Sequence, residues 1–135
     1  NIVLLFMNKI LVEVSVGELL DKISILEIKK DRIKDNDKLK YINDEYNILK
    51  SEFEKNIKVD QKLKDLFKSL KDINNKLWDI ENEKRLCEKN SNFGEVFIKT
   101  SRDIHFLNDK RGTVKLEINN YTGSKIREIK EYTNY

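Results

Sequence analysis

The sequence predicts an all-α protein: an antiparallel bundle of two helical hairpins, about four helices in all, with coiled-coil-like packing and a short extended N-terminal segment. Apolar residues recur at alternating steps of three and four through most of the 135 residues, which is the spacing of packed helices. No proline and only four glycines interrupt this pattern. We expect a single helical domain over residues 1–135, with an extended segment at 1–14 and a C-terminal tail at 124–135.

The first helix is predicted to begin at Ser15. Upstream of it, apolar residues alternate with other residues as in a short extended segment: Ile10, Val12 and Val14. The apolar letters "NIVLLF" at residues 1–6 are interpreted as upstream or fragment sequence. Ser15 and Glu18 fit the S-x-x-E capping box, in which each side chain satisfies a free amide at a helix start. An apolar face then follows at helical spacing: Leu19, Ile23, Leu26 and Ile33.

Three further helices are predicted from breaks in the apolar pattern and from capping residues. The stretch "KDNDK" ends the first helix, and Asn36 and Asp37 are the candidate N-caps of the second. Asp60 and Asn92 are the candidate N-caps of the third and fourth helices, and Gly123 supplies a helix stop. The helices come in pairs of about 18 and about 30 residues, or about 27 Å and 45 Å. The longer pair therefore overhangs, and its apolar stripe must be covered by the N-terminal segment, the C-terminal tail or a second copy of the chain. Of these we expect the second copy, in a homodimer.

Composition excludes several classes of function. The 27 basic and 24 acidic residues alternate along the chain, so a solvated surface is expected and nucleic acid is not an expected partner. The apolar run at the N-terminus is too short to span a membrane and lacks the features of a secretory signal. With one cysteine and one histidine, neither an intramolecular disulfide nor a typical zinc site is expected. We therefore expect a cytoplasmic protein without metal, membrane association or cofactor, since no nucleotide-binding loop is present either.

One pair of residues raises the question of catalysis. His105 lies four residues before Asp109, so on a helix the carboxylate could orient the imidazole as a general base requires. Cys87 could serve as a nucleophile, but it falls in a core stripe, where a buried thiol is usually inert. No catalytic residue is therefore assigned.

Arg111 interrupts the apolar stripe of the fourth helix. A guanidinium held in such a position needs a carboxylate partner, because an unpaired buried charge is very costly. The candidate partners lie on the first and third helices: Glu18, Asp21 and Glu27, and Asp79 and Glu83. One interpretation is a structural polar layer that fixes helix register. The other is an anion or carbohydrate pocket lined by Arg102, Asn108 and Arg111, with Lys22 opposite.

The same helix is expected to have two unlike faces. A rotation of about 100° per residue places four residues on its inward side: Ile104, Leu107, Asn108 and Arg111. Asp103, Lys110 and Gly112 are expected towards water, and His105 and Asp109 at the boundary.

Two segments resemble a family of small bacterial and phage proteins of unknown function. They are "VSVGELLDKISILEIKKDRI" and "RDIHFLNDKRGTVKLEINNYTGSKIREIKEY", which bracket the chain. The resemblance implies a helical fold and no assigned activity, and it directs attention to Arg102, Asn108, Asp109 and Arg111. Gly112 departs from the pattern, since the family has alanine there.

The function best supported by the sequence is a non-catalytic helical module that oligomerises or binds a protein partner. Long heptad-spaced helices of unequal length, and the lack of a catalytic constellation, favour it. The alternative is an accessory domain that binds a small anion or a sugar phosphate in the pocket around Arg102, Asn108 and Arg111.

Overall fold

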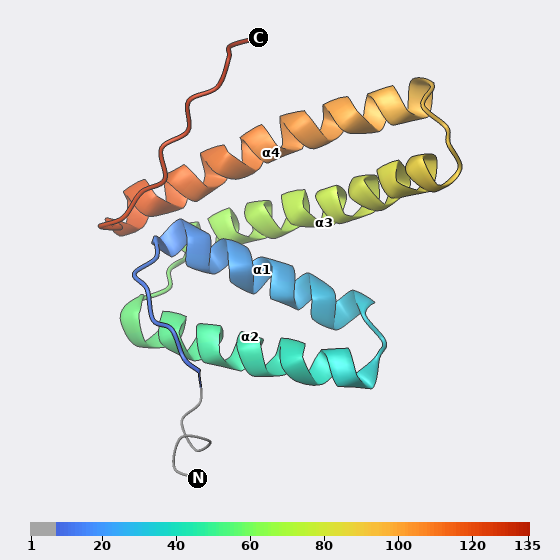
Figure 1. Ribbon diagram of the computed structural model, residues 1–135. Coiled ribbons are helices and arrows are strands. Elements are labelled where there is room, and N and C mark those ends of the chain that lie inside the picture. The colour runs from blue at the N-terminus through green and yellow to red at the C-terminus, as the bar shows by residue number, and fades with distance from the viewer. Residues whose placement is uncertain (1–7) are drawn as a thin grey trace.

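The computed structural model describes residues 8–135, whose regular structure consists of four helices (Figure 1). They are α1 (Val16–Arg32), α2 (Asn36–Asn56), α3 (Gln61–Lys89) and α4 (Glu95–Thr122). No strand occurs among residues 8–135. The predicted all-α bundle of two hairpins is confirmed, and the helices, of 17, 21, 29 and 28 residues, have the predicted short and long pairs. The interpretation of residues 1–6 lies outside the described residues.

The helix starts agree with the sequence at two of four positions. Ser15 and Asp60 cap α1 and α3 as predicted, each accepting a hydrogen bond from the amide three residues on. The predicted caps of α2 were wrong by one residue: Asp35 has the extended backbone of an N-cap and accepts from the amide of Lys38 at 3.0 Å. The cap of α4 was also wrong. Its N-cap is Gly94, because Asn92 uses its side-chain oxygen to accept from the Gly94 amide at 3.2 Å, in a turn before the helix.

Helix α1 lies between the other elements. It packs against α2 on one side and against both α3 and α4 on the other (Figure 1). The core forms where these helices meet, and its fully buried members come from all four: Leu20, Ile23, Phe53, Leu63, Leu70 and Ile118. The position of α1 therefore determines how the two hairpins fit together.

The start of α1 is completed by the end of α4. Ser15 accepts a hydrogen bond from the Glu18 amide at 3.1 Å, which is one half of the predicted capping box. Asn119 accepts from the Gly17 amide at 2.7 Å, and the Ser124 hydroxyl accepts from the first amide of the helix at 3.2 Å. Gly123 ends α4 with φ +66°, the left-handed conformation expected of a helix stop. The exposed amides of α1 are thus satisfied by residues about a hundred positions away.

Gly17 allows α1 and α4 to come into close contact. A Cβ at this position would lie 2.5 Å from the carbonyl oxygen of Lys115 and 2.9 Å from the side-chain oxygen of Asn119. No side chain fits there without displacing the α4 backbone. The contact fixes which turn of α1 faces which turn of α4, and so sets the partners of the residues that follow.

The long hairpin extends past α1, as the helix lengths predict. Arg32, the last residue of α1, reaches Asp79 on α3 at 2.5 Å. Helix α3 continues to Lys89, about 15 Å farther. We refer to residues 80–107, at this end of the α3–α4 hairpin, as the overhang. Several of its large apolar side chains are exposed: Leu86, Phe93, Val96, Ile98 and Phe106.

Candidate functional site

Asp21 is the centre of a polar cluster inside the bundle. Its side chain is only 2% exposed, although it carries a charge. Arg111 on α4 donates to both of its carboxylate oxygens, from Nε to Oδ1 at 2.9 Å and from Nη2 to Oδ2. Asn74 on α3 donates a third hydrogen bond to Oδ1 at 3.0 Å. One carboxylate thus joins three helices. Its ion pair with Arg111 and its hydrogen bonds offset the free-energy cost of burying its charge.

The protonation of Asp21 follows from these contacts. Burial disfavours the charged carboxylate, but the hydrogen bonds from Arg111 and Asn74 together outweigh burial, so the pKa of Asp21 lies below its ordinary value. The hydrogen bond to Asp21 also raises the pKa of Arg111. The two groups therefore form a charged pair at neutral pH.

Further polar residues extend the cluster on both sides. Asn74 donates to the hydroxyl of Ser24 at 2.8 Å, and that hydroxyl donates to the backbone oxygen of Asp21 at 2.7 Å. Lys115, one turn after Arg111, donates to Glu18 at 2.7 Å and lies 3.6 Å from Glu128 in the C-terminal tail. No buried side-chain nitrogen or oxygen in residues 8–135 lacks a hydrogen-bond partner. The arrangement has the properties of a structural polar layer.

The other predicted carboxylates have different partners. Glu27 accepts from Lys71 at 3.0 Å and from the Tyr46 hydroxyl at 3.3 Å. Asp79 pairs with Arg32 at the edge of the bundle, and Glu83 is exposed on the overhang. Of the five candidates, Asp21 is the one that Arg111 contacts.

Sequence reasoning missed two members of the cluster, Asn74 and Lys115. Asn74 lies on the apolar side of α3 between Leu70 and Leu77, and it is buried. A polar residue within such a stripe is the same signal that drew attention to Arg111. Lys115 follows Arg111 by four residues and so extends the same polar face of α4 towards Glu18.

The candidate ligand residues do not form one pocket. Arg102 lies nine residues before Arg111, about 13 Å along α4, and its guanidinium lies over the Phe106 ring with 5.9 Å to the centroid. Asn108 and Arg111 do line a common cavity, whereas Lys22 is exposed on α1. The prediction that Asn108 points inward was wrong. Hydrogen bonds between α1 and α4 begin at Arg111, so Asn108, almost one turn earlier, stays exposed.

Two of the residues that we expected towards water are less exposed than the sequence predicts. Gly112 is half-buried rather than open to water, since the Lys130 side chain of the tail passes over it. Asp103 is half-buried too, where it accepts from Lys99 at 2.5 Å. His105 is exposed, with its Nε2 3.9 Å from Asp109.

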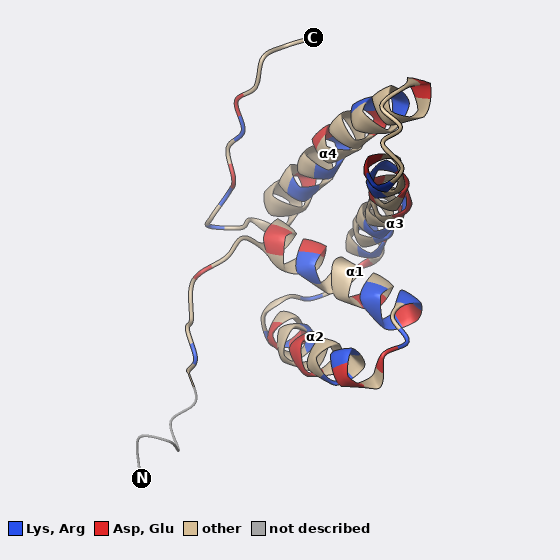
Figure 2. Cartoon of the chain, turned by 45° about the vertical axis from the view of Figure 1, so that its right-hand side comes forward, with Lys and Arg blue, Asp and Glu red and all other residues tan. Residues whose placement is uncertain are grey.

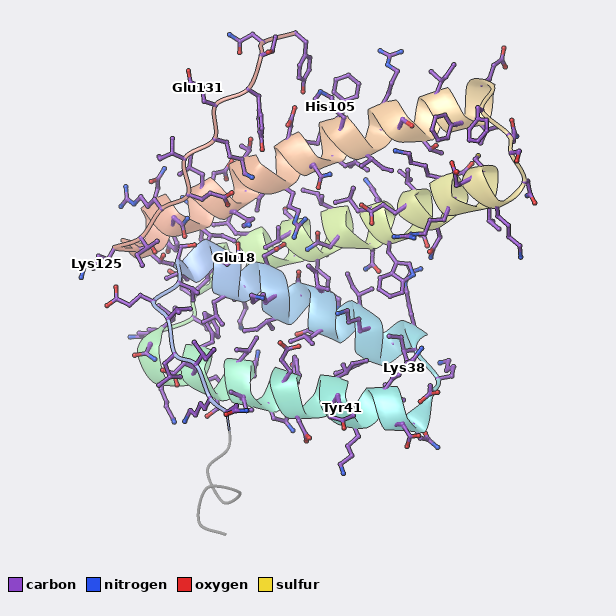
Figure 3. The ribbon with its side chains drawn as sticks, in the orientation of Figure 1. Glu18, Lys38, Tyr41, His105, Lys125 and Glu131 are labelled. Carbon is purple, nitrogen blue, oxygen red and sulfur yellow. The ribbon has the colours of Figure 1, made fainter. Side chains whose placement is uncertain are left out.

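The C-terminal tail covers this part of α4. The Tyr135 hydroxyl donates to Asp109, and the Tyr135 ring lies 4.9 Å from the His105 ring and 5.3 Å from that of Phe106, centroid to centroid. Figure 3 shows His105 on the side of α4 along which the tail runs. The imidazole thus contacts an aromatic group and a carboxylate that already accepts from Tyr135. Cys87, the other group considered for catalysis, is buried in α3.

The surface carries charges of both signs throughout. Figure 2 shows Lys and Arg mixed with Asp and Glu along the helices. Among residues 8–135, no group of three or more histidine, cysteine or acidic side chains is placed to hold a metal ion. None of the helices in this range is both long and apolar enough to cross a membrane.

Comparison with known proteins identifies the chain at the level of its family. The model of DUF6165, a family of unknown function, matches residues 10–135. The chain belongs to this family. No curated protein and no solved structure matches it.

The two segments that carried the family resemblance meet in the structure. The DUF6165 match includes Gly17 and Asp21 at the start of α1, and Arg111 and Asn119 on α4, which form the closest contact between these helices. Both segments therefore contribute residues to the helix crossing and to the polar cluster beside it.

Proposed function

We propose that the chain is a non-catalytic helical module that forms a homodimer through its overhang. The observation that carries the proposal is the exposure of large apolar side chains at one end of the long hairpin. Leu86 and Ile98 are each 56% exposed and Phe93 is 54% exposed, on elements that α1 does not reach. Removing such side chains from water contributes about 25 cal/mol per Å² of apolar surface.

The charges of the overhang favour a second copy as the partner. Between residues 80 and 107, five acidic residues balance five basic ones: Glu81, Glu83, Glu88, Glu95 and Asp103, and Lys84, Arg85, Lys89, Lys99 and Arg102. Two identical surfaces of zero formal charge do not repel each other. In a two-fold dimer each acidic residue can face a basic residue of the other copy.

The outer face of α2 supplies a contrast. Tyr41 and Ile48 are 77% and 68% exposed, but they stand apart from each other with Asp44 and Glu45 between them. Single exposed apolar residues are common on protein surfaces. These two residues lie on α2, outside the overhang. This face therefore provides a matched control.

Sedimentation equilibrium tests the proposal. We expect a dimer at about 100 μM, a concentration that detects dissociation constants up to the micromolar range. Leu86→Glu combined with Phe93→Glu should give a folded monomer, because each glutamate would be buried in the interface. Tyr41→Glu combined with Ile48→Glu should leave the dimer intact. A monomeric parent chain, or equal effects of the two double variants, would overturn the proposal.

The proposal includes a cytoplasmic location and the absence of nucleic acid binding. The first is supported by the single cysteine, which has no intramolecular partner for a disulfide. The second is supported by the mixing of basic and acidic residues along the four helices, which Figure 2 shows. Should the overhang bind a different protein instead, the purified chain would sediment as a monomer.

A further inference from the structure

We propose that the cavity between α4 and the C-terminal tail binds a small phosphate compound. The cavity has a volume of about 490 Å³, within the usual range of ligand pockets. Its α4 side is formed by His105, Asn108 and Arg111, and its tail side by Lys130 and Tyr132, among others. This binding does not depend on the proposed dimer, since the cavity is formed within one chain.

Arg111 presents an oriented donor edge to the cavity. Its guanidinium has five N–H groups, and the hydrogen bonds to Asp21 use one on Nε and one on Nη2. The pairing holds the group rigidly by its inner edge. The side chain is nevertheless 29% exposed, and it lines the cavity with its remaining N–H groups available. An arginine fixed in this way by a buried carboxylate is pre-organised to bind an oxyanion.

Among the charged side chains that line the cavity, three are basic and one is acidic. Lys115 and Lys130 line it together with Arg111, and Asp109 is the one acidic residue in its lining. Asp109 already accepts a hydrogen bond from Tyr135. Lys115 and Lys130 are paired with Glu18 and Glu128, so they balance those carboxylates. The donors that remain for a ligand come from Arg111, the Asn108 amide, His105 and the outer part of Lys130.

The arrangement of these donors favours a phosphate group over a carboxylate. They come from both α4 and the tail, so they can reach a tetrahedral group from several sides, whereas two coplanar N–H groups suffice for a carboxylate. The cavity also has room for more than the anion. Tyr132 provides an aromatic wall for the organic part of a phosphate monoester.

Gly112 brings the tail close to α4 at this place. A Cβ there would lie 3.4 Å from Cδ and Cε of Lys130, so the lysine stem passes directly over the bare helix backbone. Gly112 thus lies in the lining of the cavity. It lets Lys130 approach the same side of α4 as Arg111.

Isothermal titration calorimetry on the full chain tests the proposal, with inorganic phosphate, glucose 6-phosphate and acetate as probes. We expect binding of glucose 6-phosphate with a dissociation constant near about 1 mM or tighter, and weaker binding of acetate. Tighter binding of the sugar phosphate than of inorganic phosphate would identify a monoester site, and the reverse a site for free phosphate. Both results support a phosphate site.

Variants that keep the fold locate the binding. Arg111 is unsuitable, since its loss strands Asp21, so we choose His105→Ala combined with Lys130→Ala, both on exposed side chains. This pair should weaken phosphate binding about tenfold or more, the scale of lost hydrogen bonds to a charged group. Arg102→Ala, an exposed arginine outside the cavity, is the control and should change nothing. No heat at about 10 mM of either phosphate compound, equal affinity for acetate, or equal weakening by Arg102→Ala would overturn the proposal.

Discussion

Replacing Gly17 with alanine separates close helix contact from ordinary helix propensity. At a compatible position, glycine to alanine stabilises a protein by about 0.4–1 kcal/mol, because alanine restricts the unfolded chain. Gly17 is the second residue of α1, and its amide donates a hydrogen bond to Asn119 across the contact with α4. An alanine side chain is therefore not compatible with this position. The variant therefore tests whether the crossing of α1 and α4 tolerates one methyl group.

The structure sets the magnitude of the effect. The new Cβ would lie 2.5 Å from the backbone oxygen of Lys115, which can move only if α4 moves. Forcing an extra carbon into a packed contact costs about 1–3 kcal/mol, and loss of the hydrogen bond to Asn119 about 0.5–1.5 kcal/mol more. After the gain from alanine is subtracted, we expect Gly17→Ala to lower the free energy of unfolding by about 0.5–4 kcal/mol.

Urea unfolding at pH 7 measures the effect, with Gly112→Ala as the matched control. Its Cβ would meet only the flexible end of Lys130, at 3.4 Å, so this variant should gain up to about 1 kcal/mol. Opposite signs are the expected result. If both variants were stabilised alike, the close approach at Gly17 would not be what fixes the crossing.

Three further predictions can be tested with the same unfolding assay. Arg111→Ala should cost about 3–5 kcal/mol because it removes the cation that binds both oxygens of buried Asp21 and leaves only Lys115, 3.9 Å away. His105→Ala should cost no more than about 0.5 kcal/mol, and the opposite order would contradict the assignment of faces on α4. The lowered pKa of Asp21 means that its pairing stabilises the fold above the unfolded-state pKa and that this contribution is lost as the pH falls through the folded-state pKa. The parent chain should therefore lose more stability between pH 5 and pH 2 than Asp21→Asn, and parallel acid profiles would refute the pairing. Ser15→Ala should cost about 1 kcal/mol through loss of the N-cap, and an unchanged midpoint would show that Asn119 suffices.

Much of the fold follows from residue spacing, and the site follows only in part. The stripe of apolar residues and the caps at Ser15 and Asp60 place four helices and their approximate ends. The caps of α2 and α4 could not be chosen from sequence, because nearby residues that all favour the N-cap position compete: Asp35 with Asn36, and Asn92 with Gly94. Which residue takes the extended backbone conformation depends on how the connection packs.

The polar cluster, too, could be predicted from the sequence only in part. That Arg111 needs a buried carboxylate follows from the cost of an unpaired charge, but spacing alone leaves several carboxylates equivalent. The choice of Asp21 depends on the depth at which α1 crosses α4, which Gly17 sets through a contact between residues far apart in the chain. The cavity beneath the tail has no signature in "SKIREIKEYTNY", since a segment without regular structure has no periodicity to indicate which side chains face the protein.

The way α1 begins has a consequence for folding during synthesis. Helix α1 is synthesised before α2, α3 and α4, yet its opening amides bind Asn119 and Ser124, which are separated from them by 102 and 108 residues. Contacts between such distant positions form late, because the intervening chain must first be ordered. A nascent chain that ends before Ser124 carries a complete α1 sequence with an incomplete N-terminus. A chain that stops before Ser124 therefore has a weakened start of α1, and the corner where α1 meets the end of α4 closes only after the intervening helices are ordered.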